Sequence, residues 1–411
     1  MFALIRAWTV RLLSDTGRAK PRLNTVSSTP PFRKRREGFF MSKKKFTFID
    51  LFAGIGGFHT AMHSVGGKCV YASEWDKNAR ISYEANYKDI EPKLFAKDKD
   101  GRYMYFNEDI NDAIPSEIPN FDICCGGFPC QPFSVAGLKR GFDDTRGTLF
   151  FNIANIVKEK IESGTPPRVL FLENVRGLKN HDNGNTLKVI LATLDELGYG
   201  YSYNVLNAKY FGVPQNRERL FIIAWYKKLV NVDEFRFPLG IAPDGKTIYD
   251  KGVLKEGTIP TKVSDIFEPN ETIDPKFTIS DRMWIGHQNR KERNKRNGKG
   301  FGYSLFTADS SYTSTISARY WKDGSEILID QSDKGLNPRT LTPVEAGRLQ
   351  GYRILGNGWE HPECADNQNY NASNPEFRIV VSKKEAYHQF GNSVAIPVIK
   401  RLSEEIIKQL M

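Results

Sequence analysis

The sequence lacks the features that would mark a disulfide-stapled, zinc-stabilised or membrane-spanning protein. Its 5 cysteines are an odd number and are scattered without paired Cys-x-x-Cys spacing, so neither a disulfide framework nor a structural zinc site is indicated. No apolar run approaches the length needed to cross a bilayer. With 40% hydrophobic and 12% aromatic residues, the chain is predicted to be globular and water-soluble, in a reducing compartment, with no metal and no membrane partner.

Acidic residues are scarce at the N-terminus, and this scarcity accounts for most of the net charge of +11. Residues 1–45 hold 12 Lys/Arg and 2 Asp/Glu, which leaves 47 basic and 46 acidic residues in the rest of the chain. The body is almost neutral, so a nucleic-acid partner has to be argued from local clusters. One cluster, six Lys/Arg between Arg290 and Lys299, fits a solvated loop and a phosphate-contacting one equally well.

Internal repeats are also absent, and 411 residues allow two or three domains. Residues 1–40 have the composition of a transit peptide or of unstructured upstream sequence. Because Met41 stands directly before the first apolar strand pattern, we expect a disordered extension from a mis-assigned start or a cloning addition, with a targeting peptide as the second interpretation. We expect an α/β domain at 46–225, a smaller loop-rich, partly β domain at 226–384, and a C-terminal segment at 385–411 that returns to the first domain.

A nucleotide-binding α/β unit is predicted at the start of the first domain. Residues 45–51 form a strand pattern that runs into the glycine turn Phe52–Gly57, and an amphipathic stretch follows. A glycine turn alone fits any α/β protein, but a second strand ends in Glu74-Trp75-Asp76, about 20 residues after Gly54, where an acid that binds ribose hydroxyls is expected. Trp75 could lie against a purine or could pack at the strand end.

A third acidic side chain is expected near the same edge of the sheet. Asp109 follows a loop over residues 91–106 and a short extended segment. It could accept a hydrogen bond from an adenine amino group, or it could cap the turn at Asn111-Asp112.

A lone thiol lies on a tight loop after the short apolar strand pattern at residues 121–125. Cys130 stands within Gly126–Ser134, between Pro129 and Gln131. A thiol at a strand-to-loop transition can be reached and ionised, whereas most free cysteines are small buried hydrophobes. This stretch alone supports both interpretations equally. The glycine-containing segment at 135–148 that follows is a candidate mobile lid.

Charged side chains follow the next strands of the predicted sheet. The strand at residues 168–172 delivers Glu173 to the carboxyl edge, where open α/β sheets bind ligands. Arg217 and Arg219, at i and i+2 on an extended segment, point the same way and suit a phosphate or a carbonyl; with Glu218 they could equally form a surface ion network.

The C-terminal part carries two helix signals and one polar block. Beyond Tyr226 there is no sustained helical periodicity until Thr342 and Pro343, which form an N-cap and first turn for a helix ending near Leu349. The block Gly391-Asn392-Ser393-Val394 precedes a closing amphipathic helix over residues 398–410.

Taken together and in this order, the blocks resemble the DNA (cytosine-5) methyltransferases of bacterial restriction-modification systems. The resemblance covers residues 46–225 and 337–411, and it is carried by Pro129-Cys130-Gln131, Glu173-Asn174-Val175, Gln215 to Arg219 and Gly391-Asn392-Ser393-Val394. It implies an α/β fold: a Rossmann-like S-adenosyl-L-methionine-dependent methyltransferase sheet with helices on both faces. Residues 226–336 take the place of the family's variable target-recognition domain, where Thr315-Ile316 is similar to its Thr-Leu pair.

The resemblance also implies a role for each block. Cys130 would add to carbon 6 of cytosine, Glu173 would contact ring nitrogen 3 and the amino group, and Arg219 with Arg217 would support the base. Gln131, Ser134, Arg146 and Thr315 are expected to contact DNA. The cofactor is expected to be S-adenosyl-L-methionine, with a site lined by Phe52, Gly54, Gly56, Glu74, Trp75, Asp109, Ile110, Pro129, Leu149, Asn392, Ser393 and Val394.

The partners implied are double-stranded DNA and a cognate restriction endonuclease that acts separately. A monomer in the bacterial cytoplasm, associated with the nucleoid, is expected. Two other functions remain open: a tRNA cytosine-5 methyltransferase, which shares the catalytic core, and a non-catalytic DNA-binding paralogue. The variable region of roughly 110 residues favours duplex DNA over tRNA, and the presence of Cys130 and Glu173 favours an enzyme over a paralogue.

Overall fold

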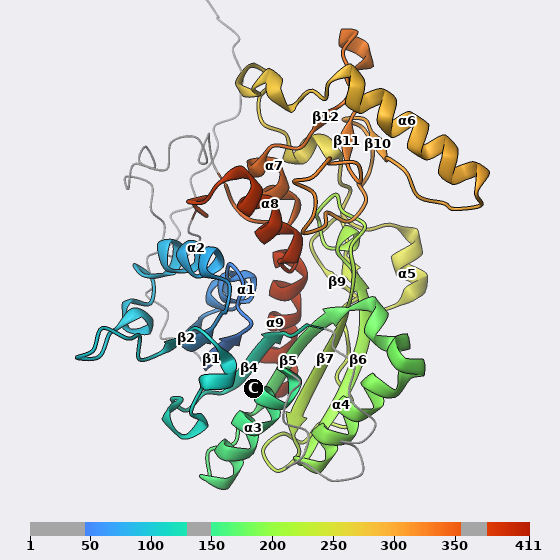
Figure 1. Cartoon of the computed structure of the whole chain (residues 1–411). Coiled ribbons are helices and arrows are strands. Elements are labelled where there is room, and N and C mark those ends of the chain that lie inside the picture. Colours follow the sequence, from blue (N-terminus) through green and yellow to red (C-terminus); the bar gives the residue numbers. More distant parts are fainter. Residues whose placement is uncertain (1–45, 130–148, 355–375) are drawn as a thin grey trace, which may run out of the picture. The chain divides into compact units, whose positions relative to one another are not determined.

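A seven-stranded sheet positions the predicted site residues (Figure 1). The computed structural model describes residues 46–129, 149–354 and 376–411. The strand order is β3-β2-β1-β4-β5-β7-β6; β3 to β5 are mutually parallel, and β7 is antiparallel to both neighbours. The strands are β1 (Phe46–Leu51), β2 (Gly67–Ser73), β3 (Phe106–Asn107), β4 (Ile123–Gly127), β5 (Val169–Val175), β6 (Tyr199–Asn207) and β7 (Glu218–Tyr226).

The strand order reverses between β1 and β4. The chain moves outward from β1 to β2 and β3 on one side, and from β4 to β5 on the other. Such a switch point leaves a crevice at the carboxyl ends of the strands, where doubly wound sheets bind ligands. The loops that begin at Phe52 and at Phe128 therefore flank that crevice.

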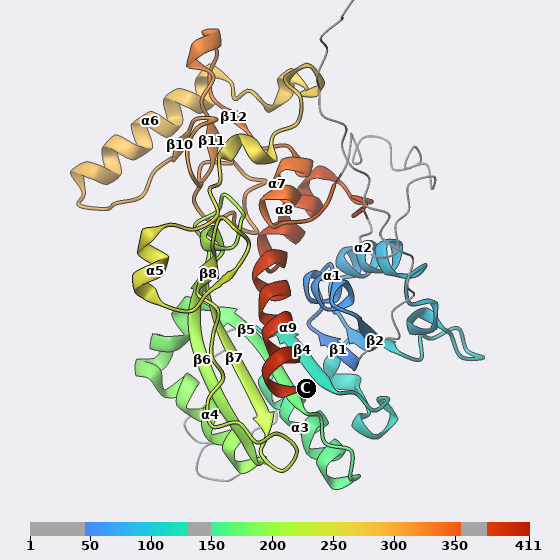
Figure 2. The ribbon, with the colours of Figure 1, turned by 180° about the vertical axis from the view of Figure 1, so that it is seen from behind.

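Helices cover both faces of the sheet, which confirms the predicted fold class. One core contains side chains of α1 (Gly57–Ser64), α2 (Lys77–Tyr87) and α9 (Ile396–Leu410) against one face of the sheet. A second core contains those of α3 (Leu149–Glu162) and α4 (Asn185–Glu196) against the other. Figures 1 and 2 show α9 along one face and α3 and α4 along the other. Because parallel strands are buried on both faces, β4 and β5 are nearly continuous apolar runs.

The region after β7 is loop-rich and partly β, as predicted. It contains two small sheets, β8-β9 and β10-β11-β12. Its elements are β8 (Gly240–Ile241), β9 (Thr247–Ile248), α5 (Lys251–Glu256), α6 (Asp281–Arg296), β10 (Leu305–Phe306), β11 (Leu328–Ile329) and β12 (Arg339–Thr340). The described residues from Phe46 onward belong to one compact unit, and the domain boundaries at 225 and 384 stay a prediction.

One of the two interpretations of the basic cluster in this region is corrected in its local structure. The basic cluster at 290–299 does not form a solvated loop, because most of it lies in the helix α6. No helical signal is visible in the sequence there, since His287 is the one residue of α6 that is buried and a helix that is polar almost all round has no apolar stripe.

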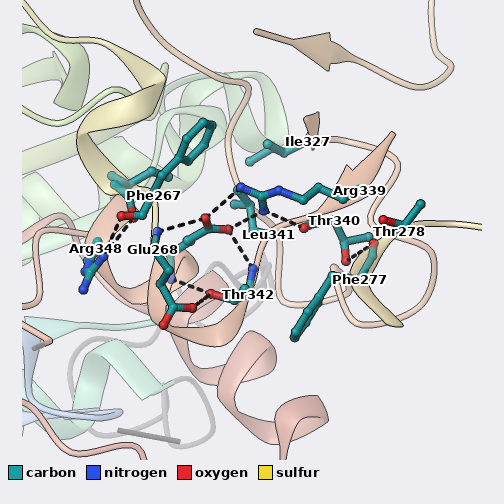
Figure 3. Close-up of polar contacts among 12 residues, drawn as sticks. Phe267, Glu268, Phe277, Thr278, Ile327, Arg339, Thr340, Leu341, Thr342 and Arg348 are labelled. Carbon is teal, nitrogen blue, oxygen red and sulfur yellow. Dashed lines mark hydrogen bonds and ion pairs between the residues drawn. The ribbon is translucent and has the colours of Figure 1, made fainter. Parts of the chain in front are cut away.

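The predicted helix after Thr342 is confirmed as α7 (Pro343–Leu349). The Thr342 side chain accepts from the Glu345 main chain, while the Glu345 carboxylate accepts from the Thr342 main chain, a capping box. Glu345 also receives two hydrogen bonds from Arg339 of β12, at 2.7 and 2.9 Å. The Thr342 hydroxyl donates to Glu268, so this buried network joins α7 to the variable region (Figure 3).

The chain returns to the first sheet through α8 (Lys383–Asn392) and α9. The apolar side of α9 lies in the same core as α1 and β1. In the parts of the chain that are described, no helix combines the length and apolarity that a membrane span requires.

Candidate active site

A cavity of about 740 Å³ lies at the switch point of the sheet. Eleven of the twelve residues predicted to hold the cofactor line this cavity, and Gly56 does not. Glu173, Arg217 and Arg219 line it too. The structure therefore brings residues from both ends of the described chain to one space.

The loop after β1 adopts left-handed backbone at the cavity wall. Gly54 has φ 55° and Phe52 has φ 57°. The Gly54 amide donates to Glu74 Oε2 at 2.7 Å, so the end of β2 holds the glycine turn in place. A bulky residue such as Phe52 in this conformation is strained, and such strain is concentrated at ligand sites.

Gly56 acts behind the cavity rather than in it. It has φ 82° at the start of α1, and a Cβ at this position would lie 2.2 Å from the Tyr87 ring. The Tyr87 hydroxyl donates to the Gly56 carbonyl at 2.7 Å. Gly56 is therefore not among the residues that line this cavity, and its place in the cofactor site stays a prediction; its small size lets α2 pack against the turn.

Glu74 and Trp75 form the far wall of the cavity. Glu74 also accepts from the Asp76 amide at 2.8 Å through Oε1. Burial raises the pKa of Glu74, and the two backbone N–H donors partly offset this shift. Trp75 is 79% exposed, so it does not pack at the strand end; its ring is available to a ligand.

Asp109 caps a turn and lines the cavity at once. Its Oδ1 accepts from the Asn111 amide at 2.9 Å and from the Asn111 side chain at 2.8 Å. The capping interpretation is thus confirmed, and the residue remains at the cavity with Ile110 beside it.

The other wall is built from β4 and β5. Glu173 lies opposite Gly127 in the strand register, and a Cβ at Gly127 would lie 3.4 Å from Glu173 Oε2. Asn174 donates from Nδ2 to the Phe128 carbonyl at 2.8 Å. The side chain of Asn174 therefore anchors the chain two residues before Cys130, a role that the motif alone did not reveal.

Four predicted residues lie outside the described part of the chain: Cys130, Gln131, Ser134 and Arg146. Pro129, the residue that precedes Cys130, is exposed and lines the cavity.

Glu173 pairs with Arg219 of β7. The Arg219 Nε lies 3.2 Å from Glu173 Oε1, and the two side chains are 19% and 11% exposed. Burial raises the pKa of Glu173, and the charges of Arg219 and Arg217 partly offset that shift. Glu173 is therefore a carboxyl group at the cavity wall whose pKa lies above its ordinary value although a cation is fixed beside it.

Arg217 has different partners from Arg219, although the two point the same way. It is 2% exposed and donates to the main-chain carbonyls of Ile316, Gly391 and Ser393 at 3.3, 3.1 and 2.6 Å. Burial, together with the charge of Arg219, lowers the pKa of Arg217 to about 9. Arg217 lines the cavity but is engaged in joining β7 to two distant segments.

Glu218 forms a surface ion pair, but its partner is neither Arg217 nor Arg219. Glu218 pairs with Arg176 at 2.5 Å, which leaves Arg219 to Glu173. Thr315 donates from its hydroxyl to the Asn216 carbonyl at 2.6 Å, so this side chain holds the main chain next to Arg217.

Comparison with known proteins decides the family. The model of the C-5 cytosine-specific DNA methylase family matches residues 46–408. The chain belongs to this family. It is a DNA (cytosine-5) methyltransferase of the type found in restriction-modification systems.

Relatives of this methyltransferase are matched over most of their length. It is 44% identical to the Type II methyltransferase M.SsoII of Shigella sonnei over 408 residues, which cover 99% of this chain and 90% of that protein. It is 45% identical to M.NlaX of Neisseria lactamica over 365 residues, with 88% and 96% covered. A Spodoptera frugiperda DNMT2 structure has a TM-score of 0.60 at 19% identity, covering 88% of this chain and 99% of that one, which shows the fold.

The buried side chain of Gln215 joins three segments of the methyltransferase, a role that the sequence does not indicate. Gln215 is 0% exposed; it donates to the Leu349 carbonyl at 3.0 Å and to Gln350 at 3.2 Å, and it accepts from the Ile316 amide at 3.1 Å. A buried glutamine has no local signal, because the type is usually exposed.

Proposed function

We propose that the protein transfers a methyl group from S-adenosyl-L-methionine to carbon 5 of a cytosine in a specific duplex DNA sequence. The observation that carries this proposal is the convergence on one cavity of the Glu173–Arg219 pair, Pro129 and the Gly54–Glu74 wall. The names of the relatives, Type II methyltransferases, support a role in protecting host DNA from a cognate restriction enzyme.

The side chains that line the cavity suit the hydrogen-bonding groups and the purine ring of S-adenosyl-L-methionine. Glu74 would accept from ribose hydroxyls, because each of its oxygens holds one backbone N–H and retains a free lone pair. Trp75 would cover the purine with its exposed face, and Asp109 would lie near the amino group. When bound, S-adenosyl-L-methionine supplies an electrophilic methyl group.

The protein's own residues would activate the ring. Carbon 5 of cytosine is a poor nucleophile, and covalent addition of the Cys130 thiolate to carbon 6 moves the electron pair of the ring double bond to carbon 5. Protonated Glu173 would donate to ring nitrogen 3 and stabilise the charge that develops, with Arg219 holding the carboxyl in place. After methylation, S-adenosylhomocysteine would leave, a base or water would take the carbon 5 proton, and ring nitrogen 3 would return its proton to Glu173. The electron pair of the carbon 5–hydrogen bond would re-form the ring double bond as the sulfur–carbon 6 bond breaks, which frees the Cys130 thiolate.

A ring stacked in a duplex cannot enter this cavity, so the target base would be flipped out. That step costs a few kcal/mol and calls for a clamp on the DNA. We assign it to Gln131, Ser134 and Arg146 on one side and to the region 226–336 on the other. Thr315, whose hydroxyl is held by Asn216, would contribute through the position of its main chain.

The test is a methylation assay read by bisulfite sequencing, with duplex DNA and tRNA offered side by side. Cys130→Ala should abolish methyl transfer and leave DNA binding measurable. Cys69→Ala, which removes a buried thiol away from the cavity, is the matched control and should retain turnover. Full turnover by Cys130→Ala, or methylation of tRNA alone, would reject the proposal.

A further inference from the structure

Helix α6 presents an arginine stripe that no described element covers. Arg282, Asn289, Arg293 and Arg296 are exposed, and with Gly286 they follow the spacing i, i+4, i+7, i+11 and i+14, which places them on one side of a helix. We call this side the outer face. Figures 1 and 2 show α6 beside β10–β12, with its length extending away from them.

The opposite side of α6 is used for packing. Trp284 lies edge-on to Tyr303 with ring centroids 4.7 Å apart, and Asn294 donates to the Phe301 carbonyl at 2.7 Å. Arg290 pairs with Asp323 at 2.9 Å. The cation at 290 is therefore structural, whereas the side chains of Arg282, Arg293 and Arg296 take no part in attaching the helix to the described residues.

The cations of the outer face have no ion-pair partner among the described residues, and the exposed Glu292, four residues before Arg296, forms no ion pair with it. Within the described ranges, Arg282, Arg293 and Arg296 form no ion pair, and neither do the nearby Lys295 and Lys299. Like charges three or four residues apart destabilise a helix, and Arg293 with Arg296 is such a pair.

The helix dipole does not account for the whole stripe. It favours cations in the last turn, where Arg293 and Arg296 lie, but disfavours one in the first turn, where Arg282 lies. An external polyanion would compensate all three charges together.

The geometry points to the backbone of duplex DNA as that polyanion: we propose that the outer face of α6 binds DNA phosphates through Arg282, Arg293 and Arg296. The stripe is about 21 Å long at 1.5 Å per residue, while duplex DNA carries a charge about every 1.7 Å along its axis, so several phosphates can face it. The contact is independent of sequence and adds to the proposed function, on which it rests.

The experiment measures the affinity of the full-length protein for a fluorescent random-sequence duplex at several salt concentrations. The triple variant Arg282→Gln, Arg293→Gln, Arg296→Gln should reduce the slope of log affinity against log salt by roughly 2 to 3, because each lost phosphate contact removes about 0.9. Its affinity at low salt should fall accordingly, with cofactor binding unchanged.

The matched control neutralises three exposed lysines elsewhere, Lys99→Gln, Lys188→Gln and Lys228→Gln, and should leave the slope close to that of the wild type. Replacing the three arginines by lysine should also preserve it, since a point charge suffices for a phosphate; this variant guards against loss of the fold. The proposal would be overturned if the slope were unchanged in the variant with Arg282, Arg293 and Arg296 replaced by glutamine. It would also be overturned if the variant with Lys99, Lys188 and Lys228 replaced by glutamine lost as much of the slope. Failure of the wild type to bind duplex DNA would instead reject the proposed function.

Discussion

Glu173 lies at the cavity wall between Gly127 on one strand and Arg219 on another. Burial raises its pKa, and the nearby cations limit the rise. A carboxyl with a raised pKa stays protonated to a higher pH than an exposed glutamate, whose ordinary pKa is about 4.3. The proton-donating form proposed for Glu173 is therefore favoured by its surroundings and is lost as the pH rises through the raised value.

We predict that Glu173→Gln lowers kcat about 100-fold or more, because an amide cannot transfer a proton. The wild-type rate should fall at the alkaline side of its pH profile as Glu173 ionises, and that fall should be absent in the variant. Single-turnover methylation at a series of pH values measures both effects.

The pH profile of the variant Arg219→Gln provides a matched comparison with the wild type. The substitution removes the positive charge that lowers the pKa of Glu173, so the falling limb should move to higher pH. Identical pH profiles for the wild type and Glu173→Gln would contradict the assigned role.

At the scale of elements, α7 is the point where the variable region is fastened to the C-terminal part. The Arg339–Glu345 pair is 4% and 0% exposed at its side chains, and Glu345 Oε1 also accepts from the Glu268 amide at 3.3 Å. Arg348 donates to the Phe267 carbonyl at 2.9 Å (Figure 3). A strand, a helix and a loop are thus held by one charged, hydrogen-bonded cluster.

We predict that Glu345→Leu lowers the free energy of unfolding by about 3 to 5 kcal/mol, because it leaves the buried Arg339 guanidinium without its counter-charge. Arg339→Met should cost a similar amount, and the double variant should cost less than the sum of the two. Urea denaturation of the wild type, the two single variants and the double variant gives the coupling free energy between Arg339 and Glu345.

The exposed pair Lys262–Asp309, 2.7 Å apart, serves as the control, and Asp309→Asn should leave stability unchanged. Strict additivity in the Arg339–Glu345 cycle would show that the pair does not act as a unit.

At the scale of the whole molecule, the cavity is assembled from both ends of the described chain. Phe52 and Glu74 come from the first two βα connections, whereas Ser393 and Val394 come from the junction of α8 and α9. Arg217 ties the second group to β7. A ligand that fills this cavity is therefore expected to stabilise the entire fold.

We predict that S-adenosyl-L-methionine at 100 times its dissociation constant stabilises the protein by about 2.7 kcal/mol, measured as a rise in Tm. Trp75→Ala should weaken this shift and remove the change in tryptophan fluorescence on binding. Ile81→Ala, at an exposed apolar residue of α2 that does not line the cavity, should behave as the wild type. A full shift in Trp75→Ala would show that the ring does not contact the cofactor.

Local patterns in the sequence determined much of the site. Strand ends, the glycine turn and the N-cap of α7 depend on neighbouring residues, so Glu74, Glu173 and the helix after Thr342 lie where they were expected. The strand β5 is longer than its apolar pattern indicates, because it continues to Val175 and holds Glu173 near its carboxyl end.

Partner groups from distant parts of the chain determined the rest. Arg217 and Arg219 cannot be told apart by their spacing in the sequence. Arg217 is a structural link because it donates to main-chain carbonyls up to 176 residues away, whereas Arg219 lies beside Glu173. The same reason applies to Gly56, whose neighbour Tyr87 belongs to α2, and to Gln215, whose partners lie beyond residue 315. Local sequence sets backbone conformation and the order of the motifs, but the side chains that meet depend on how the whole chain packs.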